Sequence, residues 1–564
     1  MRKAYFNFGM FALLFLAVVN QAFSQENAVN IDIDRAVEVG EMRPFWAWFG
    51  YDEPNYTSRE NGKKLLSELQ EMSPVPVYVR THNLLTSKGN SPGPDLKWGF
   101  TDAYSEDKNG KPIYNWTVVD SIIDVIVSRG MKPLMEIGFM PRDLSTKPEP
   151  YEHTWSQGGN IWTGWTYPPK DYEKWKNLVY QWTLHTVSRY GMKEVKTWLW
   201  EVWNEPDIPY FSGTFEEYCM MYDYAAAGLK KACPECVIGG PHTTSPRNDK
   251  ANTYLSNFIK HCLYEKNYAT GKIGSPLEYI GFHAKGNPEF VDGNIRMNMG
   301  VQLRDIQRAF ETVNSFKELK GIPIIVGECD PEGCAACSVE RDPKYGYRNG
   351  TMYSSYTASS FARIYDLMGD YKVNLQGAVS WSFEFEDQPW FAGFRELATN
   401  GIDKPVLNVF RMFGHMQGNR LQVTTKDGMG YQDIINDGVR KKADVDALAS
   451  ASGDDVWVMV WNYHDDILAQ KSTNAVLNVN HLKGQKAMIE HYRIDENYSN
   501  SFEKWKELGS PQQVDASAYE ALEKAGKLQL MASPVWKDIK ADKLSLELEM
   551  SPQAVSLIHL KVLK

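Results

Sequence analysis

The chain has 564 residues, a formal net charge of −10 and a hydrophobic content of 43%. These values are typical of a soluble globular protein with a sizeable core. The acidic balance argues against nucleic acid or an anionic membrane as a partner, although it permits an anionic sugar held by a local cation.

The N-terminal segment has the features of a signal peptide. Arg2 and Lys3 provide a positive start, and residues 8–19 form an apolar stretch that is too short to span a bilayer. Residues 22–24 have the small–x–small form of a cleavage site, and no cysteine follows that could carry a lipid anchor. We therefore assign residues 1–24 to a signal peptide and expect a periplasmic or secreted protein without a membrane anchor.

Eight strand-like apolar runs alternate with helix-like amphipathic segments through residues 45–420. This alternation predicts an α/β fold with a catalytic (β/α)8 TIM barrel. The runs are nearly continuous in apolar character, as expected for strands that are covered on both faces. The expected strands are 45–50, 75–82, 132–138, 195–205, 237–242, 279–283, 322–328 and 377–384, and the expected helices include 62–72, 118–128, 172–189, 215–232, 301–319 and 352–367.

After residue 420 the pattern changes to short strands, several with alternating polarity. We expect residues 421–564 to form an accessory β-sandwich domain, completed by N-terminal strands within residues 25–44. The expected strands there are 456–463, 473–479, 487–493, 528–531, 544–550 and 554–563.

Two carboxylates stand at the ends of separate apolar runs. Glu205 follows Asn204 at the end of the fourth run, and Glu328 ends the seventh. Polar residues at the C-terminal ends of barrel strands are typical of catalysis or substrate binding. One protonated and one ionised carboxyl group, about 5 Å apart, can cleave a glycosidic bond with retention of configuration. We therefore predict a catalytic pair that requires no metal and no cofactor.

Several short motifs accompany this pair. Residues 203–207 read WNEPD, 79–82 VRTH, 238–242 IGGPH, 282–283 FH and 404–406 KPV. Together with Glu328, these motifs resemble glycoside hydrolase family 39, the family of β-xylosidases and α-L-iduronidases. The resemblance covers essentially the whole mature chain.

The resemblance implies roles for individual residues. Glu205 would be the general acid/base and Glu328 the nucleophile. Asn204 would bind the sugar 2-hydroxyl, a contact that strengthens in the transition state. His82 and His283 would donate hydrogen bonds to hydroxyl groups of the −1 sugar.

Two further residues are candidates for the sugar-binding surface. Trp381 lies on the eighth expected strand, and an indole ring stacks well against the C–H face of a sugar. Glu386 follows it and could accept hydrogen bonds from hydroxyl groups. We expect Trp381 to form the floor of the −1 subsite.

The terminal sugar is left open between a neutral pentose and a uronic acid. Lys285 follows His283 in a sequence similar to that of the α-L-iduronidases, whose lysine faces the sugar carboxylate, whereas the β-xylosidases tend to have an uncharged aromatic residue there. Arg395 lies roughly where the iduronidases place a second carboxylate-binding arginine. A lysine at a cleft rim can hold a carboxylate, but most lysines are simply solvated.

The seven cysteines include two CxxC pairs, Cys233/Cys236 and Cys334/Cys337. The pairs are about a hundred residues apart, which exceeds the spacing of a zinc ribbon. In an oxidising compartment we expect disulfides rather than zinc. The odd number leaves at least one thiol free.

Taken together, these features predict a secreted retaining exo-glycoside hydrolase of the β-xylosidase type. It would release terminal xylosyl or uronosyl residues from oligosaccharides or polysaccharides. The alternatives are an α-L-iduronidase-like uronosidase, an inactive carbohydrate-binding barrel, and a redox or metal protein built on the CxxC pairs. The sequence leaves the oligomeric state open, including a homo-oligomer.

Overall fold

The structure is a computed structural model that describes residues 28–563, except 52–53, 90–95, 97, 156–158, 383 and 468–471. The expected signal peptide, residues 1–24, lies outside the described residues. Among the helices in the described part of the chain, none is long and apolar enough to cross a membrane.

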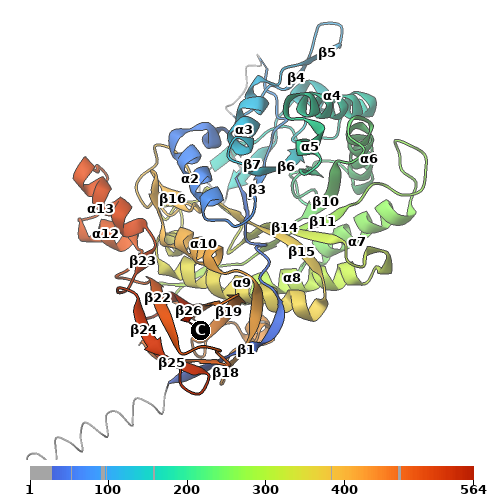
Figure 1. The fold of residues 1–564 in the computed structure, drawn as a ribbon. Coiled ribbons are helices and arrows are strands. Elements are labelled where there is room, and N and C mark those ends of the chain that lie inside the picture. Colours follow the sequence, from blue (N-terminus) through green and yellow to red (C-terminus); the bar gives the residue numbers. More distant parts are fainter. Residues whose placement is uncertain are drawn as a thin grey trace, which may run out of the picture.

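Eight parallel strands close into a barrel, which occupies the upper part of Figure 1. The ring closes where the last strand pairs with the first, with Val379 opposite Trp48. Each strand falls within or overlaps one of the expected apolar runs, so the predicted barrel is confirmed. The strands are β2 (Trp48–Gly50), β3 (Tyr78–Thr81), β6 (Lys132–Ile137), β9 (Leu199–Val202), β10 (Val237–Thr243), β11 (Tyr279–Lys285), β14 (Pro323–Asp330) and β15 (Asn374–Trp381).

Helices surround the barrel and bury their apolar stripes against it. Some begin at clear caps: Thr214 and Glu217 form a capping box at the start of α6, where each side chain bonds the backbone N–H of the other. The main helices are α2 (Glu60–Glu71), α3 (Thr117–Val127), α4 (Tyr172–Tyr190), α6 (Phe215–Ala232), α7 (Asp249–Tyr264), α8 (Met299–Asn314), α9 (Thr351–Tyr371) and α10 (Pro405–His415).

Short elements decorate the loops between the strands and helices. They are α5 (Met192–Val195), η1 (Pro54–Ser58), η2 (Arg142–Leu144), η3 (Lys317–Leu319), η4 (Pro343–Asn349), and the hairpin strands β4 (Tyr104–Glu106), β5 (Pro112–Tyr114), β7 (Glu152–Trp155), β8 (Gly159–Trp162), β12 (Glu289–Val291), β13 (Asn294–Arg296), β16 (Ala398–Thr399) and β17 (Ile402–Asp403).

A second, mainly β region lies below the barrel in Figure 1. The N-terminal strand β1 (Val29–Glu41) pairs with β18 and β21, so residues that precede the barrel are part of this later sheet. Apolar side chains from the strands between β22 and β25 on this path form a separate hydrophobic cluster. The strand order is β23 (Gln529–Leu530), β22 (Lys486–Ile494), β26 (Val555–Leu563), β20 (Asp455–Tyr463), β19 (Asp444–Ser452), β18 (Asn419–Thr425), β1, β21 (Thr473–Asn480) and β25 (Lys543–Met550), with β24 (Val535–Asp538) on β22, and the region also holds α11 (Tyr431–Asp437), α12 (Ser501–Glu507) and α13 (Ala516–Gly526).

Helix α9 joins the two parts through a buried ion pair network. Arg363 on this helix donates to Asp444 at 2.9 Å and to Asp446 at 2.8 Å, both on β19. Charges taken out of water are tolerated only when they are well paired. This network therefore fixes how the barrel sits on the β region.

Candidate active site

Arg80 lies at the centre of a buried cluster at the C-terminal ends of the barrel strands. The guanidinium donates hydrogen bonds to Glu201 at 2.8 Å, Glu328 at 3.0 Å, Asn204 at 3.0 Å and Glu136 at 3.3 Å. Arg80 is fully buried, and a buried guanidinium is very unfavourable unless its donors are paired. Because its partners come from three other strands or strand ends, Arg80 fixes their side chains relative to one another.

Glu328, the expected nucleophile, is held in its ionised form. One carboxylate oxygen accepts from Arg80, and the other contacts the Lys285 ammonium. Burial opposes ionisation, but the positive charges of Lys285 and Arg80 hold the pKa of Glu328 well below its ordinary value. The carboxylate is therefore charged throughout the neutral range.

Glu205, the expected acid/base, is tuned in the opposite direction. Burial, and then the negative charge of Glu328, raise the pKa of Glu205 to about 7. Its Oε1 lies 2.9 Å from Nδ1 of His283, whose pKa burial lowers to about 3, so that ring is neutral. A carboxyl group that is half protonated near pH 7 can give a proton in one step and take one in the next.

The turn after β9 that presents Glu205 is conformationally strained. Trp203 and Glu205 have φ values of 75° and 46°, in a region that side chains other than glycine rarely adopt. The turn is fixed by the end of β10 and the residue after it: the Glu205 N–H donates to the His242 carbonyl at 3.1 Å, and Asp207 accepts from the Thr244 N–H at 2.9 Å. Strain that the surrounding structure maintains is typical of functional sites.

The ionised groups of the cluster balance in charge at neutral pH. Arg80 and Lys285 are positive. Burial raises the pKa of Glu201, but the positive charge of Arg80 outweighs this effect and the pKa falls to about 2. Glu201 and Glu328 are therefore both negative. Burial raises the pKa of Glu136 well above its ordinary value, so this carboxyl group is neutral. Balanced charge limits the cost of burying so many ionisable groups.

Besides Lys285 and His283, three more of the predicted sugar-binding residues lie in or beside this cluster. The Asn204 carbonyl oxygen accepts from Arg80, which leaves the amide nitrogen as a donor toward a sugar hydroxyl. The Trp381 ring lies 5.5 Å from the Arg80 guanidinium and 6.3 Å from the His82 ring. His82 also packs edge-on against Trp98 at 5.2 Å. These contacts give the cluster an aromatic wall.

Arg395 is buried and already paired. Its guanidinium donates to Glu332 at 2.9 Å and lies 3.4 Å from an oxygen of Asp330, and the side chain is 1% exposed. Two protein carboxylates therefore occupy the arginine that was predicted to bind a substrate carboxylate. Of the two predicted cations, Lys285 is the one that contacts the catalytic pair.

Glu386, also predicted to bind sugar, makes its described contacts with helix α2. Its carboxylate accepts hydrogen bonds from the backbone and side chain of Asn61, at 3.1 Å and 3.4 Å, in the first turn of α2. A carboxylate at a helix N-terminus stabilises the exposed N–H groups there. The described contacts of Glu386 are thus those of a helix-capping residue.

The ligand atoms of Glu205, His283 and Glu328 lie within 4.8 Å of one another, close enough to surround a metal ion. This cluster was not apparent from sequence spacing, because its members come from three different strands. The neighbouring Lys285 and Arg80 already neutralise the site, and their positive charges oppose the binding of another cation. A separation of 4.8 Å or less also matches the spacing of the two catalytic carboxyl groups in a retaining glycosidase.

Arg80, Glu136 and Glu201 are the residues of this cluster to which no role was assigned from the sequence. Each of these ionisable side chains lies in an otherwise apolar strand. Burying such a group is costly unless it is paired, and this sequence feature could have identified them. Glu201 is further fixed by His242, whose Nε2 lies 2.7 Å from its second oxygen. These groups orient the reacting carboxylates rather than react themselves.

The CxxC pairs form disulfides within each pair, Cys233–Cys236 and Cys334–Cys337. Their sulfur atoms are bonded to each other, so these pairs offer no thiolates to zinc in this state. The three remaining cysteines, Cys219, Cys262 and Cys329, are free and buried.

Known proteins are similar to this chain along most of its length. The model of glycosyl hydrolases family 39 matches residues 29–539. A β-xylosidase of Caldicellulosiruptor saccharolyticus is 27% identical over 94% of this chain and 98% of its own length. Human α-L-iduronidase is 26% identical over 53% of this chain and 42% of its own length.

Solved structures share the fold. A monomeric β-xylosidase from Caulobacter crescentus CB15 superposes with a TM-score of 0.73 at 20% identity, over 95% of this chain and all of that one. A bacterial orthologue of human α-L-iduronidase gives a TM-score of 0.72 at 20% identity, over 95% of this chain and 84% of that one. The barrel with two strand-end carboxylates and the match over most of its length show that this chain is a glycoside hydrolase of family 39.

Proposed function

We propose that this glycoside hydrolase is a retaining exo-enzyme of the β-xylosidase type, which releases terminal xylosyl residues from oligosaccharides or polysaccharides. One observation carries the mechanism: oxygens of Glu205 and Glu328 lie within 4.8 Å, with pKa values shifted in opposite directions. That spacing leaves no room for a water between nucleophile and sugar. The near full-length similarity to a β-xylosidase supports the substrate class.

The reaction would proceed in two displacements. The Glu328 carboxylate attacks the anomeric carbon while the bond between that carbon and the leaving oxygen breaks. The leaving oxygen takes the proton of Glu205. Glu205, now ionised, then removes a proton from a water that attacks the same carbon and releases Glu328. Asn204 would stabilise both transition states through the 2-hydroxyl.

The pKa of Glu205 predicts an alkaline limit to activity. Glycosylation requires Glu205 protonated and Glu328 ionised, so kcat/KM for a 4-nitrophenyl glycoside should fall above about pH 7. The leaving group of a 2,4-dinitrophenyl glycoside needs no protonation, so kcat/KM for this substrate should fall much less above pH 7. A profile for the nitrophenyl substrate that stays flat to pH 9 would contradict the role given to Glu205.

A uronic acid at the −1 subsite is the second candidate, and the position of Lys285 favours it. The ammonium lies against Glu328, and the residue as a whole is 8% exposed, so a substrate carboxylate placed beside the ammonium would gain a largely desolvated ion pair. An ammonium group has three donors, so it could bond Glu328 and a substrate carboxylate together. Under this alternative the enzyme is an α-L-iduronidase-like uronosidase.

Aryl xyloside and aryl iduronide, each assayed with wild type and Lys285→Ala, test the two substrates. Loss of Lys285 raises the pKa of Glu328, so both substrates should show an acid limb moved to higher pH. If the lysine also binds a substrate carboxylate, the iduronide should lose a further 2–5 kcal/mol or so of transition-state stabilisation. If the ratio of kcat/KM for the iduronide to kcat/KM for the xyloside is the same in wild type and in Lys285→Ala, the uronosidase alternative is excluded. Lys285→Met keeps the side-chain volume and serves as the matched control.

We also propose that the enzyme works in the periplasm or outside the cell. The proposal rests on the basic start, apolar stretch and small–x–small site of residues 1–24. Intact-mass measurement of secreted protein after expression of the full chain tests it, with cleavage expected near Gln25.

A further inference from the structure

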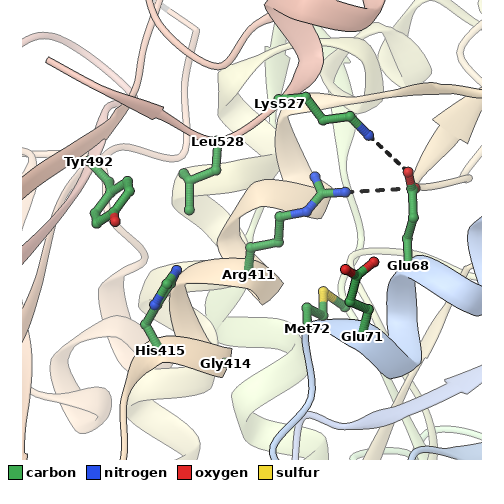
Figure 2. A pocket seen from close by; sticks show the side chains of 9 residues that line it. All are labelled: Glu68, Glu71, Met72, Arg411, Gly414, His415, Tyr492, Lys527 and Leu528. Atoms are coloured by element: carbon green, nitrogen blue, oxygen red, sulfur yellow. Dashed lines mark hydrogen bonds and ion pairs between the residues drawn. The ribbon is translucent and has the colours of Figure 1, made fainter.

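A second hollow, away from the catalytic pair, lies between the barrel and the β region (Figure 2). Its volume is about 580 Å³, within the range of small-ligand sites. Helices α2 and α10, strand β22 and residues 527–528 after α13 supply its walls. The pocket is thus built from elements distant in the sequence and from both parts of the molecule.

The pocket opens near the face of the barrel opposite the active site. Glu71 and His415, which line it, are the last residues of α2 and α10. Barrel helices run antiparallel to the strands they follow, so their C-terminal ends lie at the N-terminal face of the barrel. Gly414 lets the helices approach here, because a side chain would collide with the Met72 carbonyl oxygen. A ligand in this pocket would therefore not compete with one at Glu205 and Glu328.

The cations of the pocket are already neutralised. Lys527 lies 2.9 Å from Glu68 and 3.0 Å from Asp403, while Arg411 lies 2.9 Å from Asp403 and 3.7 Å from Glu68. Figure 2 shows the side chains of Arg411 and Lys527 both directed at Glu68. Glu71 makes no hydrogen bond or ion pair with any described residue, which adds unpaired negative charge. This balance disfavours an anionic ligand.

The wall across the pocket from Glu68 and Glu71 is formed by His415 and Tyr492, which offer ring surface and free hydrogen-bonding groups (Figure 2). The rings of His415 and Tyr492 are stacked, 5.3 Å apart and 23° from parallel. Burial lowers the pKa of His415, so its ring is neutral and offers one donor and one acceptor. Neither ring makes a polar contact within the part of the chain that the structure describes. Leu528 adds apolar surface, and Met72 adds more on the α2 side, beside Glu71 (Figure 2).

We propose that this pocket is a second carbohydrate-binding site, which holds a neutral sugar unit of a polymeric substrate. Sugar rings present apolar C–H faces beside hydroxyl groups that both donate and accept, and the pocket offers aromatic and apolar surface beside Glu71, Tyr492 and His415. A polymer held here would raise the effective concentration of its chain ends near the enzyme. The inference requires only that the enzyme acts on carbohydrate, not the proposed retention or terminal sugar.

Native electrophoresis of the full chain through gels that contain soluble neutral polysaccharide tests the proposal. The gels hold arabinoxylan, mixed-linkage glucan or galactomannan, and a polygalacturonate gel represents anionic polymers. All proteins carry Glu328→Gln so that the polymer is not hydrolysed. The catalytic site of an exo-acting enzyme binds only chain ends, which are few in a long polymer. Retardation of the protein in the gel therefore reports binding along the polymer at another site.

At least one neutral polymer should retard the parent protein. His415→Ala and Tyr492→Ala should weaken the apparent affinity by about fivefold or more. Glu71→Gln, at an exposed helix end where folding is not at risk, should also weaken it. Trp536→Ala, which removes an exposed aromatic side chain on β24, should have no effect. Absence of retardation in every neutral gel, equal retardation of parent and pocket variants, or stronger retardation by polygalacturonate would overturn the proposal.

Discussion

Replacement of Glu328 by alanine is expected to lower kcat by about 10⁴-fold or more, because the covalent step then lacks its nucleophile. Added azide should restore turnover by entering the vacated space, and the glycosyl azide formed should have the inverted configuration. Steady-state kinetics and proton NMR of the product measure both effects.

Glu328→Gln is the matched control for this substitution. The amide keeps an oxygen that can accept from Arg80, so it preserves the shape of the cluster but cannot attack the sugar. It should be as inactive as the alanine variant and should resist azide, because the cavity is filled. Wild-type-like turnover in either variant would end the assignment of Glu328.

Replacement of Glu205 by alanine should have an effect that depends on the leaving group. General acid catalysis contributes on the order of 10²–10⁴-fold, and this loss should appear in full with xylobiose, whose leaving oxygen requires a proton. With a 2,4-dinitrophenyl glycoside the first step should survive and the second should become limiting. Azide should then accelerate turnover and give a product of retained configuration.

The outcome that would contradict this role is an equal loss with both substrates and no response to azide. The variant should also lose the alkaline limb of the pH profile, because that limb reports the Glu205 carboxyl group.

The barrel could be predicted because its strands are buried on both faces. Such strands are short apolar runs with polar residues at their ends, and the eight runs correspond to the eight strands of the closed sheet. The prediction was less accurate where a local feature intervened: residues 192–195 form the short helix α5, so β9 begins at Leu199 rather than at residue 195. Helix α10 was not among the expected helices, and it begins at Pro405, which is well accommodated in a first turn.

The placement of the site residues follows the same rule. Glu205, Asn204, His283 and Glu328 stand at strand ends, and barrel closure alone brings them together. Arg395 and Glu386 lie in the loops after β15, where sequence position does not determine the direction of a side chain. The structure turns the first toward Asp330 and Glu332 and the second toward Asn61.

The role of Arg80 could not be read from local sequence, because its partners are distant in the chain. Glu136, Glu201 and Glu328 are 56, 121 and 248 residues away from it. Only the closed barrel shows that one guanidinium orients three carboxyl groups. An unpaired ionisable residue in an apolar strand indicates that partners exist, but not which residues they are.

The proposed mechanism passes through a covalent glycosyl–enzyme intermediate on Glu328, and trapping this intermediate tests the mechanism most directly. The enzyme should be incubated with 2,4-dinitrophenyl 2-deoxy-2-fluoro-β-xyloside, which slows the second displacement, and then digested and analysed by mass spectrometry. One fluoroglycosyl group per molecule is expected, attached to the peptide that contains Glu328. A label on any other residue, or an enzyme that hydrolyses aryl xyloside with an inverted product and takes up no label, would contradict it.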